Sequence, residues 1–141
     1  MNISILDASN YFKGVLLLIR KDRKITEPEV ELVKHIGKSL GFEPEFCTNA
    51  INEILENRFI IDSPPVFSTK ELALKFVKDG LAVAFSDNRL DPAEEQWLKE
   101  TLENNGFDEE VFPRERKMAS ARQVFPEKLE VDDLTVEHSK T

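Results

Sequence analysis

The sequence of 141 residues repeats one pattern at a constant offset of 65 positions. Segments 22–29 and 87–94 each carry an aspartate, a branched apolar residue, a helix-capping residue and, three positions after the cap, a glutamate. A Gly-Phe pair follows each glutamate, at Gly41-Phe42 and at Gly106-Phe107, and again the two copies are 65 positions apart. A fixed period of this length indicates two copies of one supersecondary unit, so the pattern predicts a duplicated helical module.

Charge and cysteine content narrow the class of protein. The net charge is −8, which argues against a nucleic-acid surface because phosphate contacts require clustered lysine and arginine. The only cysteine has no partner for an internal disulfide, which favours a reducing cytosol. The longest apolar run, 14–19, is far shorter than the roughly 20 residues that a membrane span needs. We therefore expect a cytoplasmic protein without membrane insertion and without a nucleic-acid partner.

Helical periodicity and capping residues predict an all-α fold of about five long helices and a short sixth. In the first half, the first expected helix begins at Asp7 or Ser9 and ends near Lys21. The second begins at a Thr26–Glu29 capping box and ends at Gly41, and the third spans about 44–57. In the second half, the expected helices run from a Ser68–Glu71 capping box to about Ser86, and from Asp91, with Pro92 at the first helical position, to Gly106.

The end of the chain has a different character from residue 113 on. Residues 108–112 predict one short helical turn that Pro113 ends, and a solvated run of charges follows it. We expect one domain over 7–112, with repeats at about 9–57 and 68–112. For residues 113–141 we expect an extended or partly disordered C-terminal arm. A short β-hairpin or a final packing strand is the alternative.

The repeated order of helix, Asp-x-x-Ile/Leu, capping box, helix and Gly-Phe resembles the TerB-like family of tellurite-resistance proteins, over about residues 9–112. This resemblance implies an all-helical fold of two pseudo-symmetric halves. It also implies an intracellular bacterial protein of the stress response that works as an interaction module with a protein partner. The family usually has Asp-Gly where this chain has Asp22-Arg23 and Asp87-Asn88, so the geometry of the first loop is expected to differ.

The acidic positions of that family fall on Asp22, Glu29, Asp87 and Glu94. If the two loops meet about a pseudo-twofold axis, four carboxylates suit a hard divalent cation, and the chain would then be a metal-dependent sensor or enzyme. The other interpretation is structural, because both glutamates are already expected as the third helical residues of capping boxes. The second loop is the better candidate, since the first is flanked by the basic residues Lys21, Arg23 and Lys24.

The remaining chemistry-bearing residues favour structural roles. With only His35 and His138 present, a zinc site or a histidine-based triad is not expected. Cys47 is expected to be a buried, inert thiol and Trp97 a core residue. The acidic residues between 94 and 110 form either a solvated face or a surface for a basic protein partner. No catalytic residues are predicted, and a binding or scaffold module is the favoured function.

Overall fold

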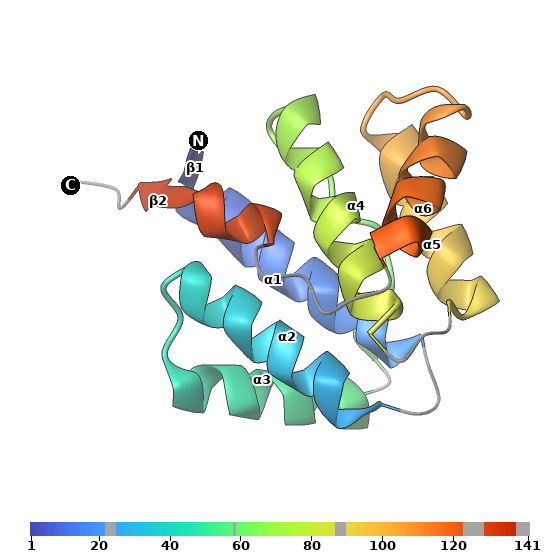
Figure 1. The fold of residues 1–141 in the computed structure, drawn as a ribbon. Helices are drawn as coiled ribbons and strands as arrows, with labels where there is room; N and C mark the ends of the chain where they lie inside the picture. Colours follow the sequence, from blue (N-terminus) through green and yellow to red (C-terminus); the bar gives the residue numbers. More distant parts are fainter. Residues whose placement is uncertain (22–24, 58, 87–89, 123–128, 138–141) are drawn as a thin grey trace.

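The computed structural model describes residues 1–21, 25–57, 59–86, 90–122 and 129–137, and within them the chain is mostly helical (Figure 1). The helices are α1 (Ile5–Arg20), α2 (Glu27–Ser39), α3 (Pro44–Glu56), α4 (Lys70–Ala84), α5 (Pro92–Asn104), α6 (Val111–Arg122) and the short 3-10 helix η1 (Glu130–Asp133). Strands β1 (Asn2–Ser4) and β2 (Thr135–Glu137) pair in parallel, with Ile3 opposite Val136. The prediction of an all-α fold is confirmed, and this two-stranded sheet is a minor addition to it.

Capping side chains start α2 and α5 where the sequence predicts. Thr26 Oγ1 accepts a hydrogen bond from the Glu29 amide at 3.3 Å, and Glu29 Oε1 accepts one from the Thr26 amide at 3.1 Å, which completes the capping box. At α5 the Asp91 carboxylate accepts from the Ala93 amide at 2.8 Å, and Pro92 occupies the first turn. These side chains satisfy amide groups that have no partner inside the helix.

Substitution of the two caps tests this account of the helix starts. Thr26→Ala and Asp91→Ala are each expected to lower the free energy of unfolding by about 0.5–2 kcal/mol, because one helix-terminal amide loses its acceptor. Denaturant titration of each variant measures the change. The exposed Thr48→Ala, which alters no N-cap, is the control. Unchanged midpoints for both cap variants would show that these side chains do not fix the helix starts.

The offset of 65 positions extends from the sequence to the helix bounds. Both ends of α5 lie 65 positions after the corresponding ends of α2, and α4 begins 65 positions after α1. Gly41 and Gly106, which follow α2 and α5, both have a φ of +90°, a conformation that residues with a Cβ rarely adopt. The two glycines therefore end α2 and α5 with the same backbone conformation.

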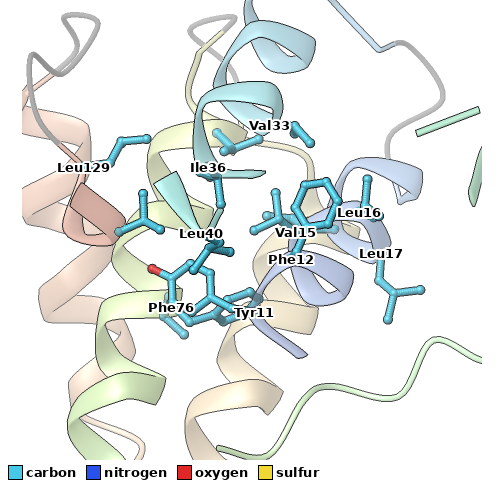
Figure 2. Packing of buried hydrophobic residues seen from close by; sticks show 14 of the residues in the cluster. Tyr11, Phe12, Val15, Leu16, Leu17, Val33, Ile36, Leu40, Phe76 and Leu129 are labelled. Atoms are coloured by element: carbon cyan, nitrogen blue, oxygen red, sulfur yellow. The ribbon is translucent and has the colours of Figure 1, made fainter. Parts of the chain in front are cut away.

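The core lies between α1 and the helices around it. Figure 1 shows α1 running through the molecule, with α2 and α3 on one side and α4, α5 and α6 on the other. Figure 2 shows Tyr11 of α1 beside Phe76 of α4, two residues that are 65 positions apart in the sequence. Their ring centroids are 5.3 Å apart in an edge-to-face arrangement, and both side chains are fully buried. Two aromatic residues 65 positions apart thus meet in the centre of the core.

Two helix starts differ from the expectation. The N-cap of α1 is Ser4, whose hydroxyl accepts from the Asp7 amide, and neither Asp7 nor Ser9 has this role. The N-cap of α4 is Thr69, one residue later than the predicted Ser68. The reason is a long-range pairing that local spacing does not reveal. The buried Asp7 carboxylate accepts hydrogen bonds from both the amide and the hydroxyl of Ser68. Asp7 and Ser68 therefore bind each other, and neither of them caps a helix.

The prediction of an extended arm from residue 113 on is wrong for the described part of that segment. Residues 111–122 form α6, and Pro113 lies in its first turn, where a helix needs no amide donor and tolerates proline. Phe112 and Glu115 are buried, and α6 contacts both α4 and α5. Pro113 therefore does not end a short turn, as the sequence predicts, but stands near the beginning of a helix.

Residues 129–137 also belong to the folded unit, and we call them the C-terminal strap. Leu129, Val131 and Leu134 are buried and join the hydrophobic core. The strap contacts α2 and α4 through η1 and pairs with β1 through β2. The alternative of a final packing strand thus describes its last part, whereas residues 123–128 and 138–141 lie outside the described ranges.

Candidate functional site

The four carboxylates predicted from the repeat have different places in the structure. Asp22 and Asp87 lie outside the described residues. Glu29 and Glu94 are both only 1% exposed, in the first turns of α2 and α5. The structural role expected for Glu29 is borne out by its bonds to the amide and the hydroxyl of Thr26. Because these hydrogen bonds at the start of α2 occupy one oxygen of the Glu29 carboxylate, less of that carboxylate is left to bind a cation.

A divalent cation at the four acidic positions stays a prediction. Among the described residues, no group of three or more histidine, cysteine, aspartate or glutamate side chains is arranged to hold a metal ion. The backbones of α2 and α5, which carry the two described glutamates, make no close approach to each other. A cation site at these positions would need Asp22 and Asp87, and the positions of Glu29 on α2 and Glu94 on α5 do not support one.

The predicted acidic surface of the second half is smaller than the sequence suggests. Glu94 is buried, and Glu95 forms an ion pair with Arg116 of α6 at 2.9 Å. Glu100 accepts a hydrogen bond from Gln96 one turn earlier on α5.

Cys47 is buried as expected, and this burial raises the pKa of its thiol, which disfavours the reactive thiolate. Trp97 is in the core as expected, with its Nε1 donating to the Asp62 carbonyl at 2.8 Å.

A groove of about 610 Å³ runs along α2, between that helix, the beginning of α3 and the C-terminal strap. We call it the α2 groove. Its floor and walls are apolar, with Leu32, Phe42, Pro44, Cys47 and Leu129 among the lining residues. The shape arises from close packing of α2 on α3, because a Cβ at Gly37 would lie 2.5 Å from the Cys47 Sγ atom. An apolar concave surface with polar groups at its edge is typical of ligand and peptide sites.

The edge of the α2 groove is mostly basic. The edge is lined by Glu31, Lys34, His35 and Lys38, which lie on one exposed face of α2, since the first and the last are each three or four positions from the two between them. Among the described residues, neither lysine of this edge forms an ion pair. Two ammonium groups unpaired within the described ranges thus stand against the single carboxylate of Glu31, which makes this edge a local cationic surface in a chain of net charge −8. The groove therefore suits a ligand that is acidic on one side and apolar on the other.

The C-terminal strap is fastened to the edge of the same groove. His35 Nε2 lies 2.8 Å from Asp132 Oδ1, and the Ser39 hydroxyl donates to that oxygen at 2.9 Å. Burial alone would raise the pKa of Asp132, but hydrogen bonds from the Leu129 amide, Ser39 and His35 lower it below its ordinary value. These contacts position Leu129 as a wall of the groove, so the strap and the groove are parts of one surface.

On its other side the strap is bound by a buried carboxylate, that of Asp79 on α4. This residue is 1% exposed and accepts hydrogen bonds from the Glu130 amide at 2.7 Å and the Val131 amide at 2.9 Å. The Tyr11 hydroxyl donates to it at 2.6 Å. Burial raises the pKa of Asp79 to about 6, although the three hydrogen bonds act in the opposite direction. Burial and the charge of Asp79 also raise the pKa of Tyr11 well above its ordinary value.

The raised pKa of Asp79 predicts a pH dependence of stability. Its folded-state pKa of about 6 exceeds the ordinary value of 3.8, so the unfolded chain loses this proton first as the pH rises. The contribution of the group is therefore fully present below pH 3.8 and is lost as the pH rises through about 6. We expect the free energy of unfolding of the wild type to fall relative to Asp79→Asn over this range, by on the order of 1–3 kcal/mol.

Denaturant titrations of the two proteins across that pH range measure the difference. The free energy of unfolding of Asp79→Asn is subtracted from that of the wild type at each pH. This difference removes the contributions of the other charged groups around the site, which are Glu130 and Asp132 of η1 and Lys75 and Lys78 of α4. A constant difference across the range would contradict the raised pKa.

The sequence interpretation missed both the α2 groove and Asp79. A signal for Asp79 was present, because it is the one charged residue on the apolar face of α4 that includes Phe76 and Val83. For the groove, Lys34 and Lys38 lie one turn apart on the exposed face of α2, but the apolar floor comes from distant segments.

A comparison of the chain with protein-family models, curated proteins and solved structures found no match. In the described ranges, none of the helices combines the length and the apolar character that crossing a membrane requires.

Proposed function

We propose that this protein is a binding and scaffold module whose α2 groove takes an acidic amphipathic helix of a protein partner. The observation that carries the proposal is the combination of an apolar floor with an edge where Lys34 and Lys38 are free of ion pairs among the described residues. A helix lying in such a groove would insert its apolar side chains between α2, α3 and Leu129 and turn its carboxylates toward the lysines.

The setting of this function follows from the resemblance to the TerB-like family. We propose a cytoplasmic role in a bacterial stress response of the tellurite-resistance type, in which the domain connects partners and carries out no reaction itself. This proposal rests on the repeated motifs at 22–29 and 87–94 and on the recurrence of the helix bounds at the same offset.

A labelled peptide tests the proposed groove. The probe is a fluorescein-labelled amphipathic helix with leucine on one face and glutamate on the other, and fluorescence anisotropy measures its affinity. Lys34→Glu/Lys38→Glu is expected to weaken binding by about tenfold or more, because attraction at the edge becomes repulsion. The control variant Lys13→Glu/Lys117→Glu makes the same change in net charge at exposed positions outside the groove, and we expect it to alter the affinity by less than about twofold.

A second variant separates occupancy of the groove from charge. Thr48 is exposed and lines the α2 groove, so Thr48→Trp places a large ring in the space that the peptide would occupy. This variant is expected to weaken binding without a change in net charge. Equal affinity of the peptide for the wild type, Thr48→Trp and Lys34→Glu/Lys38→Glu would refute the proposed groove.

A further inference from the structure

The α2 groove has one wall that neither α2 nor α3 supplies. Leu129, the first residue of the C-terminal strap, lines the groove and is only 5% exposed. Among the described residues, every other side chain that lines the groove belongs to 31–48, so the strap is the one distant segment that completes it. A helical partner in the groove would therefore contact Leu129 only while the strap is docked.

The position of Leu129 is set from the α2 side by a single carboxylate. Asp132 Oδ2 accepts a hydrogen bond from the Leu129 amide at 3.0 Å. The other oxygen, Oδ1, lies 2.8 Å from His35 Nε2 and accepts from the Ser39 hydroxyl at 2.9 Å. Asp132 therefore ties the wall of the groove to the helix that carries its edge.

The two residues after Leu129 are held from the α4 side. The amides of Glu130 and Val131 donate to the buried Asp79 carboxylate at 2.7 and 2.9 Å. The Glu130 carboxylate also pairs with Lys75 at 3.5 Å. In the described ranges α4 supplies no residue that lines the groove. The wall of the groove thus depends on contacts at a helix that a partner in the groove would not touch.

The strap is built to open apart from the rest of the fold. Residues 129–137 bury three apolar side chains, Leu129, Val131 and Leu134, and hold the helices otherwise through hydrogen bonds and ion pairs. A short segment with few buried apolar contacts opens locally at a lower free energy than the whole domain unfolds. Opening would move Leu129 away from the groove and return the Asp79 carboxylate to water, which offsets part of the lost contacts.

We propose that docking of the C-terminal strap and binding in the α2 groove are coupled, so that release of the strap from Asp79 lowers the affinity of the groove for its acidic partner. This inference rests on the proposed function, since it concerns regulation of the same groove. The two states differ in whether Leu129 forms the wall. Because the partner contacts Leu129 in only one of them, it stabilises that state, and the effect is reciprocal.

The first test removes the contact on the α2 side. The probe is again the fluorescein-labelled helix with leucine and glutamate faces, and anisotropy is the readout. Asp132→Ala is expected to weaken binding by about fivefold or more, because the wall is released from α2. Charge alone predicts the opposite change, since loss of a carboxylate beside the edge of the groove favours an acidic peptide.

Glu137→Ala is the matched control for Asp132→Ala. It removes the same charge from an exposed position of the strap that does not line the groove. Among the described residues, the Glu137 side chain forms no hydrogen bond or ion pair. This variant is expected to alter the affinity by less than about twofold.

The second test releases the strap from α4. Asp79→Ala is expected to weaken the peptide by about fivefold or more, although no residue of the groove is changed. Leu102→Ala is the control for lost stability, because Leu102 is buried on α5, a helix without close backbone contact to α2, α3 or the strap. It is expected to bind within about twofold of the wild type, at a temperature where circular dichroism shows every variant folded.

Hydrogen exchange measures the reverse effect in the wild type. Saturation with the peptide is expected to slow exchange of the Val131 amide by about the factor by which Asp79→Ala weakens the peptide, because a coupling between two sites acts equally in both directions. The amides of α6, a helix without close backbone contact to α2, α3 or η1, should slow by less.

The outcomes separate this inference from the proposed function. If Lys34→Glu/Lys38→Glu weakened the peptide while Asp132→Ala and Asp79→Ala bound it like the wild type, the groove would stand and the coupling would be overturned. Tighter binding by Asp132→Ala would also overturn the coupling, because charge alone would then explain the change. If the wild type did not bind the peptide, the proposed function would fail and the coupling with it.

Discussion

Replacing Asp79 with alanine is expected to detach the C-terminal strap from α4 and to lower the free energy of unfolding by about 2–4 kcal/mol. The carboxylate is the acceptor for three donors, namely the Tyr11 hydroxyl and the amides of Glu130 and Val131. A buried donor left without an acceptor costs about 1–3 kcal/mol, and relief of the buried negative charge offsets part of the sum. Amide hydrogen exchange should show faster exchange at Glu130 and Val131 than in the wild type.

Tyr11→Phe is the matched control for this prediction, because it removes one of the three donors and leaves the acceptor in place. We expect a loss of about 1 kcal/mol and unchanged exchange in the strap. If Asp79→Ala exchanged its strap amides at the rate of the wild type, the carboxylate would not be what fastens the strap.

Replacing Phe76 with alanine is expected to cost about 3–5 kcal/mol, an effect of the same order or larger. Phe76 is fully buried, and its ring contacts those of Tyr11, Phe67 and Trp97, with centroids 5.3, 5.3 and 6.1 Å away. The ring belongs to α4 and packs on α1, so its loss opens a cavity where the two halves of the chain meet. Denaturant titration measures the change.

Gly14 gives an independent check on the same contact. A Cβ at this position would lie 2.7 Å from the Phe76 ring, so Gly14→Ala is expected to destabilise the wild type by about 1–3 kcal/mol in spite of the better helix propensity of alanine. In the Phe76→Ala background the cavity accepts most of the added methyl group, so this penalty should become smaller, and only the approach to Pro65 Cγ at 3.0 Å remains. Strictly additive effects of the two substitutions would contradict the packing of α1 on α4 described above.

The helices that begin with local signals were predicted from the sequence with nearly correct bounds. Thr26 and Asp91 cap α2 and α5 within one turn, and Gly41 and Gly106 end them through a backbone conformation that glycine adopts readily. Each of these signals acts over a few residues, so it is visible without the rest of the fold.

Contacts between distant segments account for what the sequence did not reveal. Ser68 fails to cap α4 because Asp7, 61 positions earlier, accepts its hydrogen bonds. The strap is ordered by Asp79 and by pairing with β1, and neither partner is near it in sequence. The floor of the α2 groove likewise combines α2 and α3 with Leu129, so lysine spacing on one helix does not indicate a site.

Charge reversal on both sides of the α2 groove tests the proposed function most directly. Wild type and Lys34→Glu/Lys38→Glu are each titrated with two peptides, one with a glutamate face and one with a lysine face on the same leucine helix. We expect the wild type to prefer the glutamate peptide and the variant to prefer the lysine peptide, with a coupling of about tenfold or more between the two changes. If both proteins ranked the two peptides in the same order and by the same factor, the α2 groove would not be the binding surface.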